Sequence, residues 1–174
     1  MIIELLVKAI RTGTIFLFGC TGETITEKSG NLNLGIPGIM CIGTFGGCWG
    51  VAIYMSSLSG AAANGFLTAI IFSALLSMFA GSIYAFLTVT LRANQNVAGL
   101  TLTTFGIGFM KFFGSRINMQ HLLDAKGFFT NLFPFADKLG WFGQIFFSHG
   151  IFVYLSIILA LAASYVLSKT RVGL

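Results

Sequence analysis

Charged residues are scarce in this sequence. Only 9% of its 174 residues are Asp, Glu, Lys or Arg, whereas a soluble domain carries about 25%. No charged residue lies between Ser29 and Leu91, and none lies between Leu139 and Ser168. Both runs exceed the roughly 20 apolar residues that a membrane-spanning helix needs. Together with a mean hydropathy of +0.90, this lack of charge excludes an ordinary soluble domain and predicts an integral membrane protein.

Histidine and cysteine are also scarce, which limits the chemistry that the chain can perform. Neither the two histidines, His121 and His149, nor the three cysteines have the spacing of a metal site. The sequence shows no Ser–His pair, no aspartate pair in adjacent spans and no HExxH motif. We therefore expect no catalytic site, no metal and no cofactor. Both histidines are expected to be solvated or interfacial, and the scattered basic residues predict no nucleic-acid partner.

The apolar runs predict an all-α integral membrane protein with about five transmembrane helices. Lys8 and Arg11 interrupt the first run on one helical face, so its first turns can lie at the interface while these side chains snorkel. Gly43 and Gly47, and likewise Gly46 and Gly50, are spaced for close helix packing. We expect residues 1–174 to form a single transmembrane domain. The expected spans cover residues 2–20, 38–58, 65–91, 97–113 and 149–168.

The expected orientation of the chain across the membrane follows from the residues after the last span. Lys169 and Arg171 come directly after it, which favours a cytoplasmic C-terminus. Counting back puts residues 114–148 outside the cell and puts Arg92 and the 27–28 pair on the cytoplasmic side. Because residues 114–148 mix charges with many phenylalanines, we expect short amphipathic helices on the extracytoplasmic membrane surface. The expected location is the bacterial cytoplasmic membrane, crossed several times.

Residues 21–40, TGETITEKSGNLNLGIPGIM, place polar residues and glycines between two apolar runs. Backbone polar groups at membrane depth must be satisfied, so irregular chain occurs there only inside protein or beside a watery cavity. We therefore predict a broken or re-entrant segment after the first helix. The residues expected to form this structural break are Gly30, Gly35, Pro37 and Gly38.

Amide side chains occur in this segment and again after the third expected span. Asn31 and Asn33, and later Asn94 and Gln95, offer donors and acceptors that suit a neutral, hydrogen-bonding solute. Transporters tend to place binding sites at discontinuous helices, so these four residues are the candidates for a substrate pathway. The alternative is that the asparagines cap the helices that follow them.

Three charged residues precede the break. Glu23, Glu27 and Lys28 are interpreted as a solvated cytoplasmic turn, in which Lys28 pairs locally.

Three sequence blocks carry a family resemblance: residues 21–40, 91–100 and 169–174. Together they resemble the permease subunits of ABC importers of the branched-chain amino acid and simple-sugar group, and most closely the nucleoside and simple-sugar branch. The order and spacing of the blocks agree over essentially the whole chain. One departure is Pro37, where the family has a glutamate before Gly38. The matching residues are Gly22-Glu23, Glu27, Ser29-Gly30, Leu32-Asn33, Gly35, Gly38 and Met40, then Arg92 to Gln95 with Gly99, and finally Thr170, Gly173 and Leu174.

The resemblance implies a membrane-spanning permease that translocates a nucleoside or simple sugar by alternating access. The implied partners are a separate ABC ATPase, a second permease subunit, an extracytoplasmic solute-binding lipoprotein and the lipid bilayer. Glu23, Glu27, Lys28, Arg92 and Arg171 would lie on the ATPase side. In the family, several spans follow the last block, so the chain looks like a truncated N-terminal half.

A different class of transporter is the alternative. The size and basic, apolar composition would also suit a small substrate-binding membrane subunit of an energy-coupling-factor transporter. Such subunits usually carry an Ala-x-x-x-Ala docking pattern in the first span, where this chain has only Ala9.

Overall fold

The computed structural model describes residues 2–57, 62–117, 145 and 149–170. These residues form helices and turns, and no strand occurs among them. The all-α fold predicted for a membrane protein is therefore confirmed. The predicted surface helices of residues 114–148 lie almost entirely outside the described residues. The elements are α1 (Ile2–Lys28), α2 (Ile36–Ser57), α3 (Ala62–Ala85), the π-helix η1 (Phe86–Thr90), α4 (Gln95–Gly114) and α7 (Ile151–Lys169).

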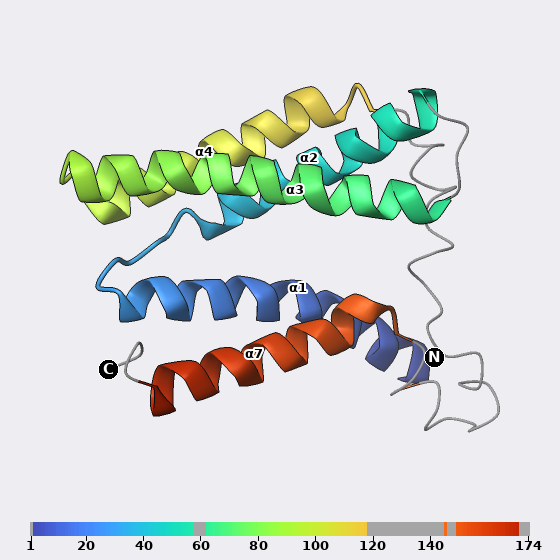
Figure 1. Cartoon of the computed structure of the whole chain (residues 1–174), viewed down its shortest axis with the longest axis horizontal. Coiled ribbons are helices and arrows are strands. Elements are labelled where there is room, and N and C mark those ends of the chain that lie inside the picture. The colour runs from blue at the N-terminus through green and yellow to red at the C-terminus, as the bar shows by residue number, and fades with distance from the viewer. Residues whose placement is uncertain (1, 58–61, 118–144, 146–148, 171–174) are drawn as a thin grey trace. The chain divides into compact units, whose positions relative to one another are not determined.

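The helices belong to two compact units (Figure 1). Unit 1 comprises Met1–Ser29 and Phe129–Leu174 and contains α1 and α7. Unit 2 comprises Gly30–Phe128 and contains α2, α3, η1 and α4. The single transmembrane domain stays a prediction.

Four of the helices in the described part of the chain are long and apolar enough to cross a membrane. When η1 is counted with α3, they begin and end within three residues of the last four predicted spans. The first helix runs eight residues past the predicted end at Cys20, to Lys28. It is not among the four, and it carries charged side chains in its first three turns and in its last two. Its crossing of the membrane stays a prediction.

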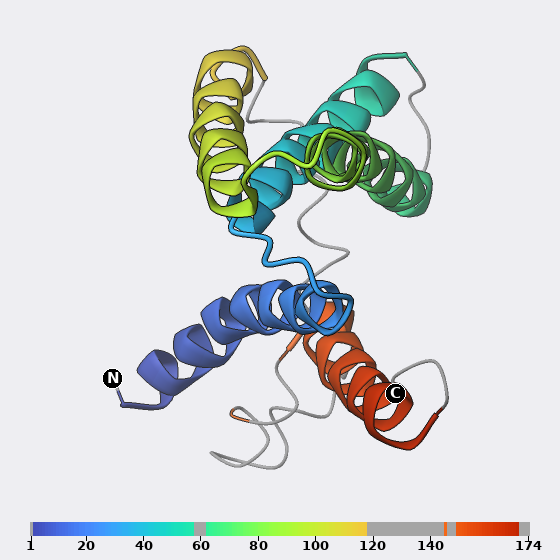
Figure 2. The same ribbon diagram turned by 90° about the vertical axis from the view of Figure 1, so that its left-hand side faces the viewer.

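Unit 2 is organised around α2, which packs along both α3 and α4 (Figure 2). Glycines on α2 let the backbones approach closely, as the small-xxx-small spacing predicted. A Cβ on Gly46 would lie 2.7 Å from the Phe72 carbonyl oxygen of α3, and one on Gly50 would lie 2.9 Å from the Thr68 carbonyl oxygen. Lipid supplies no hydrophobic drive between helices, so close packing of this kind contributes to their attraction.

The contact between α2 and α4 is equally close. A Cβ on Gly38 would collide with the Leu102 carbonyl oxygen and lie 2.6 Å from the Thr103 Cα, and a Cβ on Gly106 would collide with the Gly38 backbone. The core of the unit continues from this point through the buried side chains of Ile42, Ala80, Tyr84, Ala98 and Leu102.

Unit 1 pairs α1 with α7, and the two helices run in the same direction (Figure 1). The buried residues of α1 are Thr14 and Thr21, and those of α7 are Val153 and Ser156. Each buried hydroxyl donates to a carbonyl oxygen of its own helix, for example from Thr21 to Leu17 at 2.7 Å. The interface is therefore built from small, internally satisfied side chains, as is usual between helices in a membrane.

The outer surfaces of both units are apolar. Phe79, Phe105 and Leu161 are each more than half exposed, together with many other large apolar side chains. Such extensive apolar exposure is suited to lipid rather than to water. It agrees with the predicted multi-pass membrane location.

Candidate functional site

The break between α1 and α2 covers residues 29–35. α1 ends at Lys28, and Gly30 follows with a φ of +86°. This left-handed geometry suits glycine, which has no Cβ to clash with the neighbouring carbonyl. The chain therefore leaves the helix at the glycine that the sequence marks.

The side chains of residues 32–35, which lead into α2, alternate between exposed and buried. Leu32 and Leu34 are 38% and 39% exposed, whereas Asn33 and Gly35 are buried. Asn31 is half-buried. The Asn33 side chain therefore faces the protein, whereas the side chains of Leu32 and Leu34 face outward. One face of the break is packed against the rest of unit 2.

Gln95, the first residue of α4, holds the start of the break through both atoms of its amide. Its Oε1 accepts from the Leu32 backbone N–H at 2.9 Å, and its Nε2 donates to the Asn31 Oδ1 at 3.0 Å. These partners are more than sixty residues apart in the sequence. We call this pair of hydrogen bonds the amide clamp.

Two hydroxyl groups complete the attachment of the break to unit 2. Tyr84 of α3 donates to the Leu32 carbonyl oxygen at 2.7 Å, and Thr103 of α4 donates to the Leu34 carbonyl oxygen at 2.7 Å. With the clamp, they satisfy the Leu32 N–H and the carbonyl oxygens of Leu32 and Leu34, which have no helical partners. From Gly30 onward the break thus belongs to unit 2 and is attached to it by hydrogen bonds from α3 and α4.

Two asparagines act on the backbone beside them. Asn33 Oδ1 accepts from the Gly35 N–H at 3.0 Å, just before α2 begins. Asn94 is the N-cap of α4, and its Oδ1 accepts from the N–H groups of Asn96 and Val97 at 3.0 and 3.3 Å. The capping alternative therefore describes what Asn94 does in this structure.

Removing the cap of α4 gives a first testable prediction. We expect Asn94→Ala to lower the free energy of unfolding by about 1 kcal/mol, because two amide groups at the helix start lose their acceptor. Asn94→Asp keeps an acceptor and is expected to stay close to wild type. The measurement is thermal unfolding in detergent, with Asn96→Ala as the exposed amide control. Equal stability of all three variants would contradict the capping role.

The structure brings together the four amides that the sequence proposes for a substrate pathway. Asn31 and Gln95 bond directly, Asn94 precedes Gln95, and Asn33 lies two residues after Asn31. Asn33 is only 5% exposed, so it faces protein in this conformation. The contact of these side chains with a solute stays a prediction.

The residues predicted to make the break are divided between two elements. Gly30 and Gly35 lie in the break, whereas Pro37 and Gly38 lie in the first turn of α2. Proline fits there because the first helical N–H groups have no partner within the helix. Gly38 serves the contact with α4 rather than a turn.

The predicted cytoplasmic residues also differ in setting. Glu23, Glu27 and Lys28 lie in the last two turns of α1 rather than in a solvated turn, because the helix continues beyond Cys20. Hydroxyls such as Thr24, which donates to the Cys20 carbonyl oxygen at 2.8 Å, are satisfied within this extension. Arg171 lies outside the described residues. The ATPase side of all these residues stays a prediction.

Arg92 stands at the end of the α3–η1 helix and is exposed. Its φ is +53°, and it is the one non-glycine residue with a positive φ in the described part of the chain. The Ala93 N–H closes the helix by donating to the Leu87 carbonyl oxygen at 3.0 Å. A left-handed arginine is strained by about 1–2 kcal/mol relative to glycine. The turn thus holds a cation in a costly conformation three residues before the clamp.

Sequence reasoning missed three residues. Tyr84 and Thr103 reach the break from the interiors of apolar helices, and no pattern in the sequence marks their partners.

The prediction of a solvated or interfacial His149 is wrong, since this side chain is only 2% exposed. Its Nε2 bonds the Ile145 carbonyl oxygen at 2.8 Å, and its Nδ1 is buried without a partner among the described residues. His121 lies outside the described residues.

No metal centre is found within the part of the chain that the structure describes, where three or more potential ligands never gather. The three cysteines are free thiols. The arrangement around the break is therefore one of neutral hydrogen-bonding groups and helix ends, which can hold a segment in place and can present amides to a polar, uncharged solute.

Comparison with known proteins places these features in a family. The chain is 29% identical over 174 residues to a putative glucose ABC transporter permease of Haloferax volcanii, covering 98% of this chain and 49% of that protein. It is 31% identical to a nucleoside ABC transporter permease of Lactococcus lactis, covering 92% of this chain and 50% of that one. It is 30% identical to a guanosine ABC transporter permease of Bacillus subtilis, covering 88% and 48%. No solved structure matches.

The chain thus spans about half the length of the curated relatives that it matches. The relatives are all named as permeases of ABC transporters. The family model that describes the permease component of the branched-chain amino acid transport system matches residues 5–174. From the helices, the break and this match, we conclude that the chain belongs to that family of ABC transporter permeases.

Proposed function

We propose that the chain forms part of the solute-conducting permease of an ABC importer for a sugar or nucleoside. The observation that carries this proposal is the family match over residues 5–174, together with relatives named as glucose, nucleoside and guanosine permeases. Neutral amides at the break fit such solutes, which carry many hydroxyl and amide groups and no charge.

Transport in this proposal proceeds by alternating access, with no catalytic step on this chain. A separate ABC ATPase supplies the energy, a second permease subunit completes the pathway, and an extracytoplasmic solute-binding lipoprotein delivers the solute. The half-exposed Asn31 and Gln95 are the described amides best placed to meet the solute, because Asn33 is buried. Asn94 supports them by capping α4.

The turn that carries Arg92 suggests how the ATPase acts on the break. Arg92 is exposed and lies three residues before Gln95, whose amide clamp grips Leu32. A partner that pushes on this turn would move the start of α4 and the break together. The strain at Arg92 supports a functional reason for keeping arginine where glycine would fit better.

Uptake measurements in the native organism test this proposal. Deleting the coding sequence is expected to lower the initial uptake of one labelled solute among glucose, guanosine and uridine by at least about tenfold, while leucine uptake is unchanged. A wild-type copy should restore uptake. A copy with Arg92→Gly should give a folded protein, with the strain removed, but lower uptake because the ATPase loses its contact.

The outcomes separate the parts of the proposal. Loss of leucine uptake alone would replace the proposed solute class with a branched-chain amino acid. Full uptake with Arg92→Gly would remove Arg92 from the coupling mechanism while leaving the permease role intact. Unchanged uptake of all four solutes in the deletion strain would overturn the importer proposal itself.

A further inference from the structure

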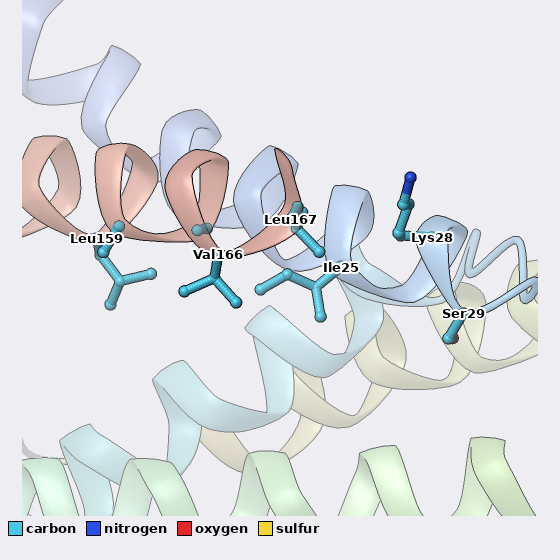
Figure 3. A pocket seen from close by; sticks show the side chains of 8 residues that line it. Ile25, Lys28, Ser29, Leu159, Val166 and Leu167 are labelled. Atoms are coloured by element: carbon cyan, nitrogen blue, oxygen red, sulfur yellow. The ribbon is translucent and has the colours of Figure 1, made fainter. Parts of the chain in front are cut away.

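Unit 1 contains an apolar hollow between the C-terminal halves of α1 and α7. Its volume is about 520 Å³, within the range of sites for small ligands. Figure 3 shows Ile25 of α1 beside Val166 and Leu167 of α7. On α7 it extends from Leu159 to Leu167, which is about 12 Å along a helix axis. The hollow is therefore an elongated apolar groove.

A cation stands at one end of this groove. The stem of Lys28 lines the hollow, and its ammonium group points away from the apolar side chains (Figure 3). This is the arrangement of a snorkelling lysine, whose stem covers apolar surface and whose charge reaches the polar layer. Ser29 adds a hydroxyl group at the same end.

The charged residue that lines the groove is a lysine. Lys28 also lines a second hollow of about 500 Å³, together with Ser168. Lys169 follows that serine, so a second lysine lies at the same end of the pair. Glu23 and Glu27 are the nearby opposing charges, and neither lines a hollow. Lys28 is therefore the one charged side chain among the residues that line the two hollows, and it places a positive charge beside the apolar groove.

We infer that this groove binds an anionic phospholipid, with an acyl chain along Leu159 to Leu167 and the phosphate on Lys28. Basic pockets between membrane helices attract anionic headgroups, and each lysine near the membrane surface contributes about a fivefold preference. A zwitterionic lipid would fill the groove equally well but would lack the net charge. The charge at the mouth therefore selects the occupant. This inference requires a bilayer but does not depend on the proposed importer function.

Native mass spectrometry of the purified chain tests the inference. In mixed micelles with equal amounts of phosphatidylglycerol and phosphatidylcholine, we expect about a fivefold excess of bound phosphatidylglycerol on the wild type. Lys28→Gln should bring the ratio close to one. Lys8→Gln removes the same charge from the other end of α1, where the side chain is also exposed, and should leave the ratio unchanged. Inorganic phosphate at the same concentration should not displace the lipid.

A second variant tests the groove rather than the charge. Ala162 lines the hollow and is exposed, so Ala162→Phe should fill the groove without disturbing the helix pair. We expect it to lower total lipid retention while Lys28 is still present. Equal ratios for wild type and Lys28→Gln, or unchanged retention with Ala162→Phe, would overturn the inference. So would a copurifying membrane polypeptide that Ala162→Phe releases, because the groove would then be a helix-docking site.

Discussion

Replacing Gly106 with alanine is expected to lower the free energy of unfolding of unit 2 by about 2–3 kcal/mol, at the upper end of the cost of overpacking. The added Cβ would collide with the backbone of Gly38. Backbone atoms cannot turn aside as a flexible side chain can, so α2 and α4 would have to separate. Separation would also weaken the nearby Thr103 bond to the break.

Gly108 provides the matched control. It lies on the same helix two residues later, and a Cβ there would meet nothing within 4 Å. Gly108→Ala is expected to leave stability unchanged or to raise it by up to about 1 kcal/mol, because alanine favours the helix. Thermal unfolding in detergent measures both. If Gly106→Ala proved as stable as Gly108→Ala, the close contact of α2 with α4 would be refuted.

Replacing Gln95 with leucine is expected to lower stability by about 2 kcal/mol and to release the break. The variant leaves the Leu32 N–H and the Asn31 amide oxygen without their described partners. An unsatisfied group away from water costs about 1–3 kcal/mol. Hydrogen exchange should show the amide of Leu32 exchanging at least about tenfold faster, while amides in the middle of α3 keep their protection.

Two further variants resolve the amide clamp. Gln95→Glu keeps an acceptor for the Leu32 N–H but cannot donate to the Asn31 oxygen, so an intermediate loss of about 1 kcal/mol is expected. Tyr84→Phe removes only the hydroxyl bond to the Leu32 carbonyl oxygen and should also cost about 1 kcal/mol. If Gln95→Leu left the exchange of Leu32 unchanged, the clamp would have no role in fixing the break.

The helices can be predicted well from the sequence, because in lipid a long uncharged run is sufficient to require a helix. Long uncharged runs must become helices at membrane depth, and α2, α3, α4 and α7 follow the predicted spans closely. The glycines of α2 also show in their spacing which face packs against a neighbour. The end of α1 was less predictable, since Glu23 and Glu27 are polar but are good helix formers.

For the candidate site, the sequence predicts which residues belong to it but not which of them contact one another. Glycine and asparagine at residues 30–35 indicate irregular chain, and the amides after the third span indicate a second polar point. That Gln95 reaches back to Leu32 depends on how α2, α3 and α4 pack, which no local pattern contains. The contacts of Tyr84 and Thr103 with the break could not be predicted for the same reason. A single hydroxyl in an apolar helix ordinarily bonds to the backbone of its own helix.

The π-helix at Phe86–Thr90 determines the direction in which the chain leaves α3 toward α4. In this wide turn the Leu91 N–H donates to the Phe86 carbonyl oxygen, five residues back. It therefore holds one residue more than an ordinary helical turn, and one residue corresponds to about 100° of rotation about the axis. A chain shortened by one residue here would still form a long apolar helix, yet Gln95 would emerge on another side of it. The number of residues between Tyr84 and Gln95, whose side chains both bond Leu32, therefore decides whether both can reach it in the same fold.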